Sequence, residues 1–139
     1  MEQTEIEFLL LADAVENVNG KLYVMGGGWD RFGSPNFPTI GRLGIAASVL
    51  VPKALAEKMQ VLRLQFRYGS LTSPSVVSMD LAAQVETNTP PGYVHPDVHR
   101  IFVVVNGNFP IPQPGKYEIR AQLADGHGKA VQFEAAIVS

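Results

Sequence analysis

The chain has 139 residues, a length typical of one domain, and 11 basic against 13 acidic side chains leave a formal net charge of −2. Hydrophobic residues make up 46% and charged residues 17%, which excludes a disordered chain. No apolar run approaches the roughly 18 residues that a membrane helix needs, and the net charge is the wrong sign for a nonspecific nucleic-acid binder. We therefore expect a single globular domain, residues 1–139, without a nucleic-acid or membrane partner.

The absence of cysteine narrows the chemistry further. It excludes disulfides, thiol nucleophiles, iron–sulfur clusters and thiolate zinc sites. The N-terminus is acidic where a secretory signal is basic, and the apolar stretch from Phe8 to Ala12 is too short for a signal core. We expect a cytoplasmic protein.

The first predicted elements form a hairpin, because apolar residues at 6–12 and 22–25 flank Asn19-Gly20, a pair that tolerates the positive φ of tight turns. A nearly continuous apolar run from Gly44 to Val51 predicts the next strand. The only helical pattern follows, from Pro52 to Met59, where a proline near the start and good helix formers predict one or two turns.

Further along the chain, side chains alternate between apolar and polar or form β-branched runs, which is typical of strands. The turn sequence Asp125-Gly126-His127-Gly128 joins the last two strands into a hairpin. The five strands predicted in this part lie at 61–68, 76–85, 101–105, 117–123 and 131–137.

About eight short strands without alternating helices predict an all-β fold, an antiparallel two-layer β-sandwich with one short helical turn. Tyr117 opens a strand directly after a Pro-Gly corner. This is typical of the tyrosine corner of immunoglobulin-like domains, in which the hydroxyl bonds to upstream backbone; an ordinary tyrosine at a strand start is the alternative. Two proline-rich segments, Arg31–Gly41 and Thr87–Pro96, are expected to be loops.

Two strings near the N-terminus point to a family. Leu10–Ala14 reads Leu-Leu-Ala-Asp-Ala, and Gly20–Trp29 reads Gly-Lys-Leu-Tyr-Val-Met-Gly-Gly-Gly-Trp. Together they resemble the N-terminal signature of a functionally uncharacterised family of small bacterial proteins, and the late Pro-Gly-x-Tyr strand that ends in Asp125-Gly126 is similar too. The family has no assigned activity, so the resemblance implies an all-β fold and no function.

Trp29-Asp30-Arg31-Phe32 combines two aromatic rings with two opposite charges at the end of a strand, and such residue types are enriched in binding hot spots. Core packing of Trp29 is the alternative, because many sandwiches bury one large aromatic residue. The triple glycine before it does not match a phosphate loop, since Ser34 stands where a lysine is required and no helix pattern follows. We interpret the glycines as a bulge or a close approach of backbone.

His95, Asp97 and His99 would share one face of an extended segment, and their donors could hold zinc or another transition metal. Pro96 disrupts regular strand pairing, so an exposed loop with ordinary histidines is the alternative. This segment supports the alternative function, a metal-dependent enzyme or small-ligand binder. No serine elbow or metalloprotease motif is present, and we assign no catalytic residue, no cofactor and no enzymatic activity.

Several strands carry apolar residues on both faces, whereas a two-layer sandwich buries only one face of each sheet. One example is Phe102 and Val104, which alternate with other apolar residues of 101–105. We therefore predict a non-enzymatic module that binds a partner protein or copies of itself as a homo-oligomer. An apolar sheet face or an unpaired edge strand makes the contact, with the Trp29 loop at its rim. A small-molecule carrier with a cavity between the sheets is compatible with the same pattern.

Overall fold

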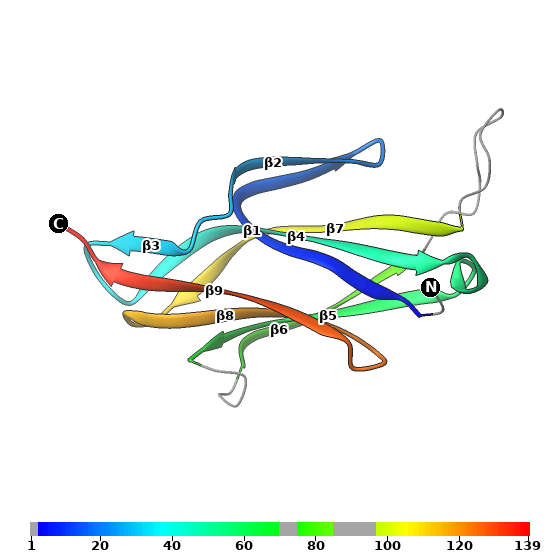
Figure 1. Ribbon diagram of the computed structural model, residues 1–139. Helices are drawn as coiled ribbons and strands as arrows, with labels where there is room; N and C mark the ends of the chain where they lie inside the picture. Colours follow the sequence, from blue (N-terminus) through cyan, green and yellow to red (C-terminus); the bar gives the residue numbers. More distant parts are fainter. Residues whose placement is uncertain (1–2, 70–74, 85–96) are drawn as a thin grey trace.

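The computed structural model describes residues 3–69, the backbone of 75–84, and residues 97–139 (Figure 1). Within this part of the chain, nine strands and one short 3-10 turn, Lys53–Leu55, make up the regular structure. The strands are β1 (Glu5–Val18), β2 (Lys21–Gly27), β3 (Arg31–Ser34), β4 (Thr39–Pro52), β5 (Met59–Tyr68), β6 (Ser75–Gln84), β7 (Val98–Ile111), β8 (Gly115–Leu123) and β9 (Gly128–Ile137).

The strands form two sheets that pack face to face (Figure 1). The four-stranded sheet, called sheet A below, has the order β2-β1-β4-β7, and the five-stranded sheet, called sheet B, has the order β3-β9-β8-β5-β6. Neighbouring strands pair antiparallel, except β3, which runs parallel to β9. This arrangement confirms the predicted all-β two-layer sandwich, with one strand more than the sequence indicated.

The additional strand lies in the segment Arg31–Gly41, which was predicted to be a loop. That prediction is wrong for β3, and it is wrong again from Thr39 onward, where β4 begins. The sequence Arg-Phe-Gly-Ser is too short to show a period, and it is extended because it pairs with the end of β9, from Arg31 opposite Glu134 to Ser34 opposite Ile137. Pairing with a strand distant in sequence, rather than local preference, therefore makes this segment a strand, as is common for β structure.

The predicted helix at 52–59 is reduced to a single 3-10 turn. The two flanking strands take up its ends, because Pro52 is the last residue of β4 and Met59 the first of β5. The predicted strand at 101–105 is also much longer in the structure, since β4 and β7 pair along their whole length, from Thr39 opposite Ile111 to Pro52 opposite Val98. Loop Thr87–Pro96 lies outside the described residues.

The alternating residues supply the core between the sheets. Its centre is a set of stacked rings, in which Phe66, Tyr117 and Phe133 lie with centroids 5.3 to 6.0 Å apart. The hydroxyl of Tyr117 donates to the carbonyl of Gln113 at 2.6 Å and accepts the N–H of the same residue at 3.2 Å. This confirms the predicted tyrosine corner, while the immunoglobulin-like assignment of the whole fold stays a prediction.

Both predicted hairpins are present. Asn19 and Gly20 join β1 to β2 with φ of 53° and 73°, the two positive values that a tight turn of this kind requires. The turn between β8 and β9 is stabilised locally, since the N–H of His127 donates to Oδ1 of Asp125 at 2.9 Å. These turn residues therefore act as the sequence predicted.

The β1–β2 hairpin folds back over the outer face of sheet A (Figure 1). β1 pairs with β4 as far as Ala12 opposite Gly44 and then leaves it. The backbone of β1 passes so close above β4 that a Cβ on Gly44 would lie 3.0 Å from Cα of Ala14. Asn106 of β7 holds the crossing segment, because its amide accepts the N–H of Val15 at 2.9 Å and donates to the carbonyl of Val15 at 2.8 Å.

Candidate interaction surfaces

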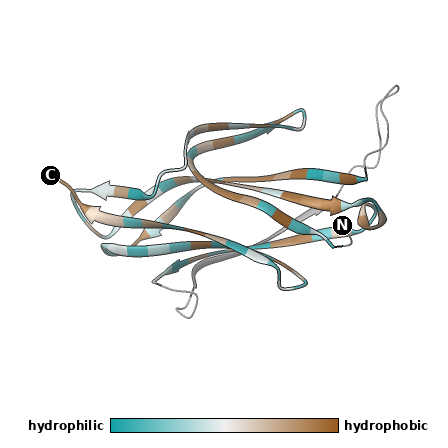
Figure 2. Cartoon of the chain, viewed as in Figure 1, coloured by the Kyte–Doolittle hydropathy of each residue, from teal (hydrophilic) through white to brown (hydrophobic). Residues whose placement is uncertain are grey.

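The outer face of sheet B is polar and hydrogen-bonded. Glu118 is buried there and accepts hydrogen bonds from Nε of Arg120 at 3.2 Å and from Nε2 of Gln132 at 3.4 Å. Arg67 donates to the amide oxygen of Gln65 on the same face. In Figure 2, β8 and β9 accordingly alternate between hydrophilic and hydrophobic residues. This face therefore has the properties of an ordinary solvated surface.

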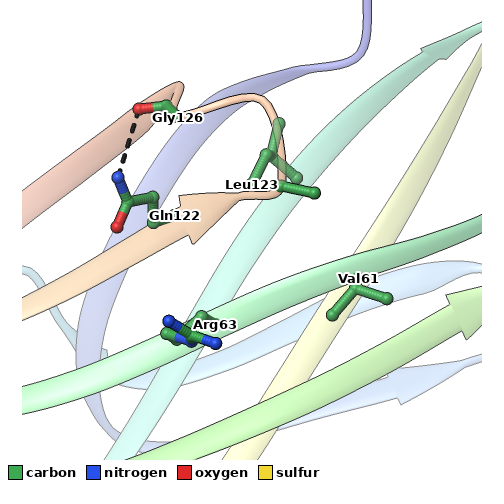
Figure 3. A pocket seen from close by; sticks show the side chains of 6 residues that line it. Val61, Arg63, Gln122, Leu123 and Gly126 are labelled. Atoms are coloured by element: carbon green, nitrogen blue, oxygen red, sulfur yellow. Dashed lines mark hydrogen bonds between the residues drawn. The ribbon is translucent and has the colours of Figure 1, made fainter.

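A hollow of about 400 Å³ lies at one end of sheet B, beside the β8–β9 turn (Figure 3). Val61 and Arg63 line it from β5, and across the turn Nε2 of Gln122 donates to the carbonyl of Gly126 at 3.3 Å. Among the described residues that line it, Arg63 is the only charged one. A single charge next to aliphatic groups specifies no chemistry, so we assign no site here.

The outer face of sheet A is apolar. Phe8, Ser48 and Phe102 lie side by side on β1, β4 and β7, and the two phenylalanine rings come within 6.4 Å of each other on either side of the small serine. Leu10 and Val104 flank β4 in the next row in the same way, with a small residue, Ala46, between them. Phe102 and Val104, predicted to be interaction residues, are both half-buried on this face.

The chain covers part of this face itself. Val15 of the folded-back hairpin packs on Ala46, and both are almost fully buried, in a small cluster separate from the main core. The surplus apolar residues that the sequence shows therefore have two fates. One end of the face is covered by the hairpin, and Leu10 and Val104 pack against this cluster while staying half-exposed. Phe8, Leu50 and Phe102 are half-exposed outside the cluster.

An ion pair closes the other end of the apolar face. The strand register shifts between Ile6 and Phe8, and this bulge lies at Glu7. The carboxylate of Glu7 accepts Nε and Nη2 of Arg100 at 2.9 and 2.7 Å and the hydroxyl of Ser48 at 2.8 Å. The hydrogen bonds from Arg100 lower the pKa of the Glu7 carboxyl below its ordinary value. Since a bulge has no sequence period, this contact could not be predicted.

β7 forms the edge of sheet A, and it has few of the features that protect edge strands. Its residues 101–105 are five consecutive apolar side chains, all half-exposed, and Arg100 is its only Arg, Lys, Asp or Glu. The opposite edge differs, because β2 begins with Lys21 and contains Gly26 at a φ of 61°. Within the described part of the sandwich, β7 is therefore an apolar edge with one charged residue, which the β1–β2 hairpin contacts through Asn106 and through the bond from Asn17 to the carbonyl of Phe102.

The structure places the predicted segment Trp29-Asp30-Arg31-Phe32 at the far end of the sandwich. Trp29 is half-buried and packs edge-on against Phe133 with ring centroids 5.6 Å apart. Phe32 also packs on the core, whereas Asp30 and Arg31 are exposed. The alternative of core packing thus describes the two rings better, and a role of these four residues in binding stays a prediction.

The triple glycine and Trp29 border a cleft of about 530 Å³. A Cβ on Gly26 would lie 2.2 Å from Oδ2 of Asp13, and the N–H of Gly28, at a φ of 81°, donates to the carbonyl of Leu11 at 2.7 Å. At Gly26 the glycine thus leaves room for the side chain of Asp13, and of these two contacts only the bond from Gly28 to Leu11 joins backbone to backbone. Both contacts bring the two halves of the N-terminal signature together at one cleft, whose lining residues are Asp13, Gly26, Gly27, Gly28, Trp29, Arg31, Phe32, Gly33 and Arg42.

The predicted metal segment is described only in part. His95 lies outside the described residues, Asp97 is exposed and its carbonyl accepts the N–H of Lys53 at 2.8 Å, and His99 is half-buried opposite Val51. Across residues 3–69 and 97–139, no group of three His, Cys, Asp or Glu side chains could hold a metal ion. The metal site therefore stays a prediction.

In the described part of the chain, no helix is long and apolar enough to cross a membrane. Comparison with curated proteins and with solved structures returned no match. A family model, described as a family of unknown function (DUF6941), matches residues 7–136 and thus nearly the whole sandwich. The chain therefore belongs to this family of unknown function.

Proposed function

We propose that this protein is a non-enzymatic association module whose sheet A binds a second copy of the chain along β7. The observation on which this rests is the difference between the two outer faces. Sheet B presents hydrogen-bonded polar groups, whereas sheet A presents half-exposed large apolar side chains next to an open edge strand. Apolar faces and unprotected strand edges are typical of protein interfaces.

The sequence of β7 suits antiparallel pairing with itself. When two copies of β7 pair around a twofold axis at Val103, Phe102 of each lies opposite Val104 of the other, and Arg100 lies opposite Asn106. An aromatic residue opposite a β-branched one is a favourable cross-strand pair, and no like charges face each other. In the free chain, Nδ2 of Asn17 donates to the carbonyl of Phe102 at 3.3 Å in an exposed hydrogen bond. Pairing breaks this bond and replaces it with backbone hydrogen bonds between the two copies of β7.

A second copy is favoured over a foreign chain because a twofold interface needs only one self-complementary patch. The axis at Val103 places the two outer faces on the same side, so that the apolar surfaces of both sheets A become continuous. Phe102 and Val104 then lie next to the axis, whereas Arg100, three residues from Val103 along β7, lies farther from it, as in interfaces with an apolar core and a polar rim.

Native mass by light scattering over a range of concentrations tests the proposal. We expect twice the chain mass of 15.1 kDa for the wild type. Phe102→Ser with Val104→Ser should give the monomer mass, and Val104→Lys, which adds a charge to the edge without emptying the face, should do the same. The matched control is Ile137→Ser, which removes an isolated apolar side chain that is 66% exposed, and it should keep the wild-type mass.

A wild-type mass of 15.1 kDa at every concentration would overturn the proposal. A dimer that survives both edge variants would overturn it as well, because the contact would then lie elsewhere. Circular dichroism of each variant separates loss of association from loss of fold.

A further inference from the structure

The cleft beside the triple glycine contains two arginines without a partner. Arg31 enters it from the start of β3 and Arg42 from the outer side of β4, and both side chains are exposed. Neither forms a hydrogen bond or an ion pair with any residue that the structure describes, although Glu134 lies opposite Arg31 in the β3–β9 register. The guanidinium groups therefore keep all their donors available for a ligand.

The acidic group of the cleft is Asp13. Its carboxylate lies against Gly26, in the space that a side chain would occupy there, and it too has no partner among the described residues. Among the residues described at its lining, the cleft thus has two positive charges and one negative, although the whole chain has a net charge of −2. An anionic group is the natural ligand for this local excess, because arginine binds planar or tetrahedral oxyanions through paired N–H donors.

The walls of the cleft are fixed to the rest of the sandwich. Trp29 and Phe32 pack on the core on one side, and Gly41 allows the close packing of Phe32, whose ring lies 3.2 Å from the site of an added Cβ. On the other side, the backbone at Gly26 and Gly28 is fixed by the Asp13 contact and by the bond to Leu11. The cleft has a volume of about 530 Å³, and most of its lining residues are exposed, so a ligand can enter from solvent.

We propose that this cleft binds a small molecule with a carboxylate or phosphate group, which Arg31 and Arg42 bind together. Asp13 narrows the choice of ligand. A ligand that has a hydrogen-bond donor or a positive charge next to its anionic group can bind the Asp13 carboxylate as well as the two arginines. The cleft has no lining residue from β7, so this proposal does not depend on the proposed self-association.

The chain has a single tryptophan, which makes Trp29 a built-in reporter for this cleft. The probes are inorganic phosphate, citrate and glycine, titrated into full-length protein while its fluorescence is followed, with sodium chloride at equal ionic strength as the reference. We expect a saturable change with at least one probe. A response to phosphate alone identifies a phosphate site, one to citrate alone a carboxylate site, and a preference for glycine a site that also uses Asp13.

Three variants test the assignment of residues. Arg42→Gln and Arg31→Gln should each weaken binding at least tenfold, and Arg63→Gln on the outer face of sheet B is the matched control that should leave it unchanged. Asp13→Asn removes a like charge at constant shape and should tighten the binding of phosphate severalfold. No fluorescence change beyond that of sodium chloride, or equal binding by the wild type and Arg42→Gln, would overturn the proposal.

Discussion

Replacement of Tyr117 by phenylalanine measures what the tyrosine corner contributes to stability. The change removes one oxygen and keeps the buried ring, which packs against both Phe66 and Phe133 and has no exposed surface. Lost with the oxygen are its two hydrogen bonds to the backbone of Gln113, at 2.6 and 3.2 Å. Burial raises the pKa of this hydroxyl, so it stays a donor at neutral pH.

The magnitude follows from these two bonds. Each contributes about 0.5 to 1.5 kcal/mol net, so the free energy of unfolding should fall by about 1 to 3 kcal/mol. With an unfolding entropy of about 2 cal/mol/K per residue, a chain of 139 residues loses roughly 3 °C of Tm for each kcal/mol. We therefore expect Tm to fall by about 3 to 10 °C.

Thermal and urea unfolding of Tyr117→Phe and of Tyr68→Phe make the comparison. Tyr68 packs edge-on against Tyr117 with ring centroids 5.1 Å apart, but its hydroxyl makes only a 3.4 Å exposed bond to the carbonyl of Pro114. Its loss should lower the free energy of unfolding by less than about 0.5 kcal/mol. If both variants unfold within 0.5 kcal/mol of the wild type, roughly the precision of such data, the corner does not stabilise the sandwich as argued.

The other predictions concern the outer face of sheet A. Gly44→Ala places a Cβ 3.0 Å from the backbone of Ala14 and should lower the free energy of unfolding by about 1 to 3 kcal/mol in urea titrations. The control Gly107→Ala places a Cβ 3.3 Å from a side-chain atom, on the ring of Phe109, rather than 3.0 Å from backbone, and should lower the free energy of unfolding less, so equal losses would contradict the close approach. Because Arg100 lowers the pKa of Glu7 in the folded state, that carboxylate stabilises the protein above its ordinary pKa, and the contribution is lost as the pH falls through the folded value. Thermal unfolding of Glu7→Gln in acid should therefore depend less on pH than that of the wild type, and identical profiles would refute the linkage.

Local patterns were sufficient for much of the fold. The alternation in β5 and β8 predicted which side chains enter the core, because successive residues of a strand point to opposite faces. In β9 it did so for Val131, Phe133 and Ala135, whereas Ile137 at the end of the strand is 66% exposed. Asn19-Gly20 predicted the first hairpin, since few residue pairs accept its dihedral angles. Tyr117 after a Pro-Gly corner predicted the bond from its hydroxyl to Gln113. The two residues are only four positions apart, so this prediction requires no information about the rest of the chain.

The sites depend on contacts that no local pattern encodes. β3 is extended because it pairs with β9 at the edge of sheet B. Glu7 binds Arg100, 93 residues away, because the bulge in β1 turns its side chain outward. The apolar face of sheet A is visible in the sequence as surplus hydrophobic residues, but which part of it stays open depends on how the β1–β2 hairpin folds back.

The sequence by itself determined most of the strands, the two hairpin turns and most of the buried faces, since these follow from backbone preferences and from a period of two residues. Only the tertiary structure decided which surfaces stay exposed and which charges meet at one cleft. Asp13, Gly26 and Arg42 come together through the β1–β2 pairing and the passage of β1 over β4, and side chains so distant in sequence become neighbours only when the strand register is set.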